Sequence, residues 1–188
     1  MPRYVRAFAP GGTFFFTVNL YERHRMLLTD HISDLRAAFA FVREQKPFVN
    51  RAYVVLPDHI HCIWTLPKGD ADFSLRWQSI KARFARQIPE GEHLSARRLK
   101  KGERGIWQRR FWEHMIRDEN DFQRHVDYIH INPVKHGHAQ AVRDWPHSSF
   151  RAYVRRGVYP ADWAGGEDRK STRLNSSHTD ISRMPSSA

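Results

Sequence analysis

The run from Tyr53 to Trp64 constrains the fold more than any other part of the chain. Its β-branched, aromatic and aliphatic residues are interrupted by Pro57 and Asp58, a pattern that predicts two strands joined by a tight turn. Because successive side chains of a strand point to opposite faces, His59 and His61 are expected to share one face. Both imidazoles can then reach one ion, while the residues that alternate with them pack in a core. Two histidines leave a metal site incomplete, so further ligands must come from elsewhere in the chain.

The remaining pattern predicts an α+β fold in which helices pack on an antiparallel sheet. A helix capped by Asp30 or Ser33 is expected to end before Pro47. Further elements are predicted at 13–20 (strand), 73–88 (helix) and 107–116 (strand). The order of strand, helix, two strands, helix, strand and helix is typical of helices packed on a sheet of hairpins.

The last predicted helix starts at Asp118 or Asn120 and carries Tyr128 and Asn132, which share a face because they are four residues apart. Pro133 is expected to end it, since the residue before a proline is pushed out of helical geometry. If this helix packs beside the strand with the histidine pair, Asn132 can supply a third metal ligand. Two imidazoles and an amide oxygen suit Mg²⁺ or Mn²⁺ and leave positions for water or phosphate. Structural zinc would use four protein ligands and fits less well, because the chain has a single cysteine.

This arrangement predicts a reaction on DNA. The metal would bind a non-bridging phosphate oxygen, and the Tyr128 hydroxyl would attack phosphorus to give a covalent phosphotyrosine and a free 3′-hydroxyl. The energy of the phosphodiester is kept in that link, so reversal can join a second strand without ATP. A phenol has an ordinary pKa of about 10 and needs activation. His125 and His130 on the same helix are candidates for that role.

A formal net charge of +11 on 188 residues indicates a polyanionic partner, with nucleic acid ahead of membrane. Single-stranded nucleic acid is held by cations beside aromatic rings, so segments that combine the two predict DNA contacts. The candidate residues are Arg3, Tyr4, Arg6, Arg76, Lys81, Arg83, Arg109, Arg110 and Lys135. The sequence has no long apolar stretch and no signal-peptide pattern, and its lone Cys62 suits a reducing compartment. We therefore expect a cytoplasmic, nucleoid-associated protein with no membrane partner.

Together these segments resemble a known family. The His-Ile-His motif at 59–61 and the segment 128–135 are similar to the single-tyrosine HUH transposases, and specifically to the REP-associated tyrosine transposases, which are transposases of the insertion-sequence type. The segments 11–18 and 107–114 share this resemblance, which covers residues 3 to 163.

The resemblance implies a ferredoxin-like antiparallel sheet with helices packed on it, which is the HUH endonuclease-type fold. It implies a divalent metal, and cleavage and joining of single-stranded DNA at hairpins formed by palindromic repeats. By the same resemblance His59 and His61 match the HUH ligands, Tyr128 the nucleophile, and Asn132 the ligand on the helix. Many relatives in the wider group carry glutamine at that last position.

The resemblance leaves two alternatives for the activity. One is a domesticated protein that binds hairpin DNA without cutting it, against which the intact His59, His61, Tyr128 and Asn132 argue. The other is a replication initiator or relaxase of the same chemistry, which usually has extra domains. We expect one domain at 1–165, acting as a monomer or homodimer, and a Ser/Thr-rich tail at 166–188 that is disordered or non-native.

Overall fold

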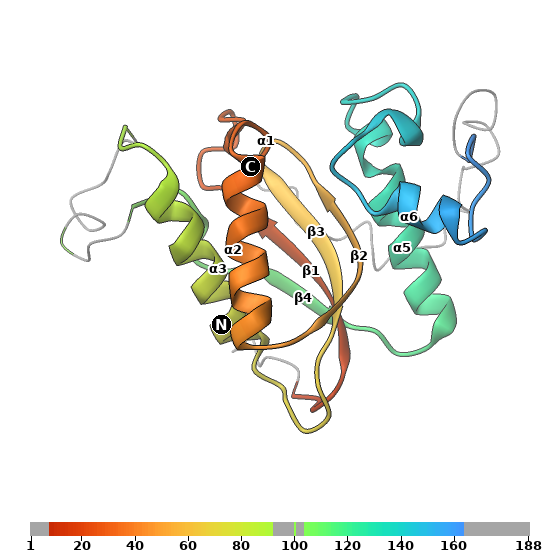
Figure 1. Ribbon diagram of the computed structural model, residues 1–188, viewed down its shortest axis with the longest axis horizontal. Helices are drawn as coiled ribbons and strands as arrows, with labels where there is room; N and C mark the ends of the chain where they lie inside the picture. The colour runs from red at the N-terminus through yellow and green to blue at the C-terminus, as the bar shows by residue number, and fades with distance from the viewer. Residues whose placement is uncertain (1–7, 92–99, 101–103, 164–188) are drawn as a thin grey trace, which may run out of the picture.

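The computed structural model describes residues 8–91, 100 and 104–163, which build a four-stranded antiparallel sheet with helices on both faces (Figure 1). The strands are β1 (Thr13–Asn19), β2 (Val49–Val55), β3 (His59–Thr65) and β4 (Trp112–Met115), in the spatial order β2-β3-β1-β4. Each neighbouring pair is antiparallel, with β1 and β3 at the centre. This arrangement confirms the predicted α+β, ferredoxin-like fold. The predicted domain boundary after residue 165 and the tail 166–188 lie outside the described residues.

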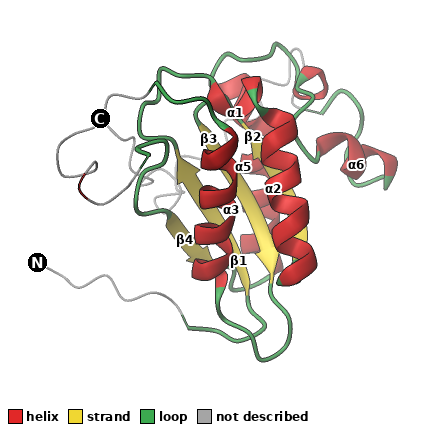
Figure 2. Ribbon diagram, turned by 60° about the vertical axis from the view of Figure 1, so that its left-hand side comes forward, coloured by secondary structure: helices red, strands yellow, loops and turns green. Residues whose placement is uncertain are grey.

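Helices cover the two faces of the sheet unequally (Figures 1 and 2). α2 (Ile32–Gln45) and α3 (Phe73–Gln87) lie side by side on one face, whereas α5 (Glu119–Lys135) packs on the other face against β2 and β3. Shorter helices complete the described fold: α1 (Leu27–Asp30), the 3-10 helix η1 (Val142–Asp144) and α6 (Phe150–Arg155). Within the described ranges, none of these helices has the length and apolar character needed to cross a membrane.

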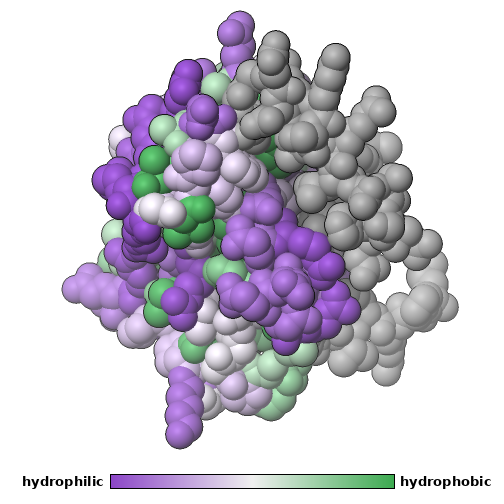
Figure 3. All heavy atoms as spheres, turned by 90° about the vertical axis from the view of Figure 1, so that its right-hand side faces the viewer, coloured by the Kyte–Doolittle hydropathy of each residue, from purple (hydrophilic) through white to green (hydrophobic). Residues whose placement is uncertain are grey.

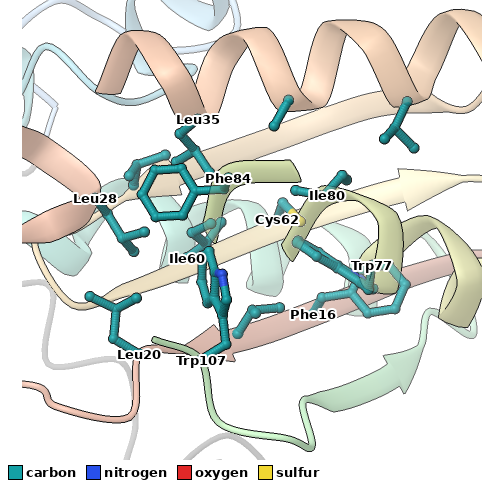
Figure 4. Close-up of a cluster of buried hydrophobic side chains, with 14 of the residues drawn as sticks. Phe16, Leu20, Leu28, Leu35, Ile60, Cys62, Trp77, Ile80, Phe84 and Trp107 are labelled. Atoms are coloured by element: carbon teal, nitrogen blue, oxygen red, sulfur yellow. The ribbon is translucent and has the colours of Figure 1, made fainter. Parts of the chain in front are cut away.

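The core between the sheet and the α2–α3 layer is built largely from aromatic side chains. Ile60, Cys62 and Trp64 of β3 are buried in it, as the predicted alternation requires. The indole of Trp64 stacks on that of Trp77 in α3, with ring centroids 4.3 Å apart. Figure 4 shows Trp77 beside Phe16 of β1 in the same cluster. A slip of β3 by one residue would move this whole set to the other face, so the core fixes the direction of the intervening histidines.

The opposite face of the sheet carries the residues that alternate with this core. There Ile63 packs with Val126 and Ile129 of α5 in a second apolar cluster. His59 and His61 lie on this same face of β3 and are only 4% and 2% exposed. Two imidazoles are thus enclosed under a helix, where a buried polar group needs a partner.

α5 runs through Pro133 and ends at Lys135, so the prediction that this proline ends the helix is wrong. A proline lacks an N–H donor and its ring crowds the carbonyl four residues back, but so close to the end of a helix little regular structure is lost. The N–H of His136, three residues further along, still donates to the carbonyl of Asn132. Asn132 therefore stays in regular helix one turn beyond Tyr128.

α2 begins at Ile32 without the predicted side-chain cap from Asp30 or Ser33. The short α1 leads almost directly into it, and the N–H of His31, the residue before α2, donates to the carbonyl of Leu27 in α1. The backbone of the preceding turn therefore supplies an acceptor near the helix start, in place of the side-chain cap that the sequence pattern predicts.

β4 occupies only Trp112–Met115 of the strand predicted at 107–116. Trp107 makes an isolated bridge with Leu20 just past the end of β1. The regular ladder with β1 then starts at Trp112, which pairs with Thr17. Cross-strand pairing is therefore continuous along only part of the predicted segment.

Candidate active site

The histidine pair of β3 has its Nδ1 atoms held by neighbouring oxygens. The two imidazole centroids are 4.8 Å apart. His59 Nδ1 lies 2.6 Å from Asp58 Oδ1, and His61 Nδ1 lies 2.9 Å from Thr17 Oγ1. An ionised carboxylate can only accept, so His59 Nδ1 carries a proton, and in the neutral form of the ring the lone pair is then on Nε2. Nε2 of His61 is buried and has no hydrogen-bond partner among the described residues. An orphaned nitrogen of this kind suits coordination of a metal ion.

The electrostatics of the pair favour neutral His61. Burial holds the pKa of His61 well below its ordinary value, and the nearby His59 and His136 lower that pKa further. The ring of His136, just after α5, lies 5.5 Å from that of His59 between centroids. His61 is therefore neutral at pH 7, and neutral imidazole is the form that binds metal.

Asp58 is ionised beside this pair. Burial alone would raise the pKa of Asp58, but hydrogen bonds from His59 and Arg23, together with their charges, outweigh it and hold that pKa well below its usual range. The Arg23 Nε atom donates to Asp58 Oδ2 at 2.6 Å. Neither Asp58 nor Arg23 is among the site residues predicted from sequence. A carboxylate next to a histidine in the motif is a visible signal for Asp58, whereas Arg23 comes from the distant loop after β1.

α5 brings the half-buried Tyr128 against the histidine pair. The phenol centroid lies 5.1 Å from that of His61 and 6.1 Å from that of Phe15 on β1. The ammonium of Lys135 is 5.4 Å from the phenol centroid. Burial raises the pKa of Tyr128, while the neighbouring Asn132 side chain opposes that rise. The phenol is therefore protonated at neutral pH and must lose its proton to act as a nucleophile.

Asn132 is fully buried one turn beyond Tyr128. It is close enough to the phenol to influence its pKa, yet neither Oδ1 nor Nδ2 has a hydrogen bond of good geometry within the described part of the chain. Leaving a buried amide unsatisfied costs about 1–3 kcal/mol, so such a group calls for a ligand. The structure thus brings His59, His61 and Tyr128 into contact, with Asn132 on the adjacent helical turn.

A second cluster of ligand-type side chains lies at the start of α5. His114, Asp121 and His125 offer ligand atoms within 4.8 Å of one another, donor types that can hold a metal. In the structure His114 Nε2 lies 2.8 Å from Asp121 Oδ2, and His125 Nδ1 lies 2.7 Å from the Asp121 carbonyl. Arg117 donates to Asp121 Oδ2 from its backbone and from Nε. Of the two predicted N-caps, Asp118 and Asn120, Asp118 is the cap and accepts from the N–H of Asp121, so this network also anchors the first turn of α5.

The two histidines predicted as candidate activators of Tyr128 have other partners. His125 belongs to the cluster at the start of α5 and packs on Phe15 at 4.8 Å between centroids. His130 is fully buried, and its Nε2 lies 2.9 Å from Ser149 Oγ. Burial lowers the pKa of His130 to about 3, so this imidazole stays neutral at physiological pH. Both contacts give these histidines a clear role in packing.

The predicted DNA contacts on α3 fall into different environments. Arg76 is 2% exposed, and its guanidinium donates to the Asp70 carboxylate and to the carbonyls of Lys46 and Pro47. Lys81 donates to the Gln108 carbonyl at the edge of an open groove of about 620 Å³ between α3 and residues 104–111. A buried arginine whose donors are taken by protein acceptors stabilises the fold. Arg76 therefore has a structural role, whereas Lys81 lies at a groove that DNA could reach.

The other predicted DNA contacts lie on the surface or outside the described residues. Arg109, Arg110 and Lys135 are exposed, and Arg109 lines the same groove as Lys81. The Arg83 guanidinium stacks 3.7 Å above the Phe41 ring. Figure 3 views the side of α5 and α6, where hydrophilic side chains predominate among the described residues. The residues outside the described ranges are Arg3, Tyr4 and Arg6.

Known proteins similar to this chain match it over most of its length. No family model matches the sequence. A REP-associated tyrosine transposase of Escherichia coli (strain K12) is 51% identical over 165 residues, which are 88% of this chain and 92% of the relative. A putative relative with the same family name from Haemophilus influenzae (strain ATCC 51907 / DSM 11121 / KW20 / Rd) is 46% identical over 171 residues, 90% of this chain and 97% of the relative. A solved REP-associated tyrosine transposase bound to a REP hairpin matches with a TM-score of 0.75 and 51% identity, covering 88% of this chain and 93% of that one.

Proposed function

Because the chain belongs to the REP-associated tyrosine transposases, we propose that it cleaves and rejoins single-stranded DNA at hairpins formed by palindromic repeats. The solved relative bound to a REP hairpin supports this substrate class. The observation that carries the proposal is the contact between Tyr128 and His61, at 5.1 Å between ring centroids. This contact places the proposed nucleophile on α5 next to the histidine pair on β3.

A divalent metal, Mg²⁺ or Mn²⁺, would be held in this proposal by His59, His61 and Asn132. The residues fit such an ion because His61 Nε2 and the Asn132 amide are buried without hydrogen-bond partners in the described structure. Imidazole nitrogens with an amide oxygen also form a donor set that these ions accept. When bound, the ion withdraws charge from a non-bridging oxygen of the phosphate.

Tyr128 would then form the covalent link to DNA. Its Oη attacks phosphorus, the bond from phosphorus to the 3′-oxygen breaks, and the leaving strand ends in a 3′-hydroxyl after the phenol proton passes to solvent and the 3′-oxygen takes one up. The 5′-phosphate is left on the tyrosine, and attack by another 3′-hydroxyl restores the phenol and joins the strands. The Lys135 ammonium beside the phenol ring offers positive charge to the phosphate at this point.

DNA contacts away from the tyrosine are proposed for four exposed or half-buried cations. Lys81 and Arg109 line the groove beside α3, and Arg110 is exposed next to it. Arg83 is placed on the same helix with its guanidinium over Phe41. Contacts of this kind to phosphates position DNA without reading its sequence, and they make binding depend on salt.

The proposal is tested by incubating the full chain with a single-stranded hairpin oligonucleotide and Mn²⁺. A covalent protein–DNA adduct is expected on a denaturing gel, and Tyr128→Phe is expected to abolish it while hairpin binding persists. Tyr53→Phe is the matched control, because Tyr53 packs against the α2–α3 core and not at the histidine pair. Hairpin binding without any adduct in Mn²⁺ or Mg²⁺ would instead identify a DNA-binding protein that does not cleave.

A further inference from the structure

The turn between β2 and β3 places a carboxylate behind the histidine pair. Asp58 Oδ1 lies 2.6 Å from His59 Nδ1, and Asp58 Oδ2 accepts from Arg23 Nε at 2.6 Å. The exposed fractions of these side chains fall from 34% for Arg23 to 14% for Asp58 and 5% for His59. The three groups form a hydrogen-bonded chain from the surface into the site, which we call the Arg23–Asp58–His59 relay.

The backbone fixes the middle of this relay independently of its side chains. The N–H of Leu20, at the end of β1, donates to the carbonyl of Asp58. The N–H of Leu56 donates to the carbonyl of His59, which closes the turn. These two bonds hold the backbone of Asp58 and His59, while each oxygen of the Asp58 carboxylate has its own side-chain partner.

We propose that Asp58 and Arg23 are positioning residues for metal binding: Arg23 orients the Asp58 carboxylate, and Asp58 orients the His59 ring so that Nε2 faces the ion. The inference rests on the proposed metal-dependent function. A carboxylate behind a histidine ligand selects the tautomer with the proton on Nδ1 and makes Nε2 a stronger donor. Loss of such a partner lowers metal affinity by roughly 10- to 100-fold.

The two histidines of the pair differ in this respect. His61 has the neutral hydroxyl of Thr17 at its Nδ1, whereas His59 has a carboxylate that is itself paired with a guanidinium. A charged partner polarises an imidazole more strongly than a hydroxyl does. His59 is therefore the stronger donor of the two, and removal of the Asp58 charge is expected to weaken metal binding more than removal of the Thr17 hydroxyl.

A purely structural role for the same contacts makes a different prediction. If Arg23 and Asp58 only pin the turn, their loss lowers the stability of the metal-free protein and leaves its intrinsic metal affinity unchanged. If they position His59, the metal affinity of the folded protein falls, and it does so whether or not the loss of the ion pair also lowers the metal-free unfolding temperature. Measuring both quantities on the same variants separates the two roles.

The experiment measures Mn²⁺ affinity of the full chain by electron paramagnetic resonance titration, alongside thermal unfolding without metal. Asp58→Asn keeps the size and one acceptor but removes the charge, and Mn²⁺ binding is expected to weaken by about 10- to 100-fold. Arg23→Met is expected to weaken it less, with recovery in Arg23→Lys. Asp34→Asn is the matched control. Asp34 on α2 also has a histidine Nδ1 beside its carboxylate, that of His31 at 3.4 Å, but this contact lies away from the histidine pair of β3.

Unchanged Mn²⁺ affinity in Asp58→Asn overturns the inference, as does an equal loss in the Asp34→Asn control. If Asp58→Asn does not fold, Arg23→Met decides, and unchanged affinity there overturns it. The proposed function is judged separately by the Tyr128 adduct. An adduct in wild type with unaltered affinity in the relay variants leaves that function standing without the relay. If the wild-type chain neither binds Mn²⁺ nor forms an adduct, both the proposed function and the relay are overturned.

Discussion

Thr17 Oγ1 lies 2.9 Å from His61 Nδ1, across a β1–β3 ladder in which these two residues are direct partners. β1 therefore supplies a side chain to the histidine pair of β3 although the two strands are far apart in sequence. The contact depends on the register of the ladder, because a shift of one residue would bring an opposite-facing side chain to His61.

Thr17→Val is expected to weaken Mn²⁺ binding several-fold, up to about 10-fold. Loss of a hydrogen-bond partner behind a histidine ligand typically lowers metal affinity by about 10- to 100-fold, and a neutral hydroxyl should lie at or below the lower end of that range. Valine keeps the branched shape, so the free energy of unfolding should fall by about 1 kcal/mol or less. Mn²⁺ titration and urea unfolding check the two effects. Thr13→Val is the control, since Thr13 Oγ1 pairs with Thr65 Oγ1 at 2.9 Å at the other end of the same ladder. An equal loss of affinity in both variants would contradict the assignment.

Asn132→Leu is expected to stabilise the metal-free protein by about 1 kcal/mol, because an unsatisfied buried amide is replaced by an apolar side chain of similar size. The same change should abolish stabilisation by Mn²⁺ and the DNA adduct. Asn50→Leu offers a matched comparison, since Asn50 Oδ1 is also buried without a partner in the described structure but lies on β2. Asn50→Leu should keep the adduct. Urea unfolding with and without Mn²⁺ measures both, and an Asn132→Leu variant that is still stabilised by Mn²⁺ would rule out the ligand role.

Acid should destabilise the fold partly through His130. Its pKa is lowered by burial from 6.5 to about 3, so between these values the unfolded chain binds a proton that the folded chain does not. The contribution of His130 to stability is complete above pH 6.5 and is lost as pH falls toward 3. The slope for one such group is at most about 1.4 kcal/mol per pH unit. In His130→Gln, the free energy of unfolding measured from pH 7 to 4.5 should fall less steeply, and parallel curves would refute this.

Arg76 and Lys81 are expected to affect different quantities, although both are cations of α3. Arg76→Met leaves the Asp70 carboxylate and the carbonyls of Lys46 and Pro47 without their donor and should cost about 1–3 kcal/mol of stability, with the hairpin affinity of the folded fraction unchanged. Lys81→Ala should lower hairpin affinity and reduce the slope of log affinity against log salt by about one. Urea unfolding and fluorescence anisotropy at several salt concentrations distinguish them. A larger affinity loss in Arg76→Met would reverse the assignment.

The order of strands and helices could be predicted because alternation and helical periodicity are local signals. The same alternation correctly separated His59 and His61 from Ile60 and Cys62. The prediction at Pro133 failed because a proline rule written for helix interiors overstates the cost near a helix end. These local rules say where elements form, but they do not say how far each one runs.

The site could be predicted only in part. The spacing of Tyr128 and Asn132 on a helix is visible in sequence, and the helix does meet the histidine strand. Thr17 and Arg23 could not be found, because their contacts depend on strand register and on a loop that returns from β1. Nor could sequence separate the buried Arg76 from exposed cations, since both kinds look alike in a charge count.

The central place of β3 protects the histidine pair against local unfolding, which its sequence does not reveal. His59 and His61 sit on a strand paired on both sides, with Asn19 and Thr17 opposite them on β1 and Val54 opposite His61 on β2. Fraying begins at sheet edges and helix ends, where fewer backbone groups are bonded. The imidazoles should therefore hold their relative positions through fluctuations that disturb β2, β4 or the end of α5, and the backbone amides of β3 should be among the slowest to exchange with solvent.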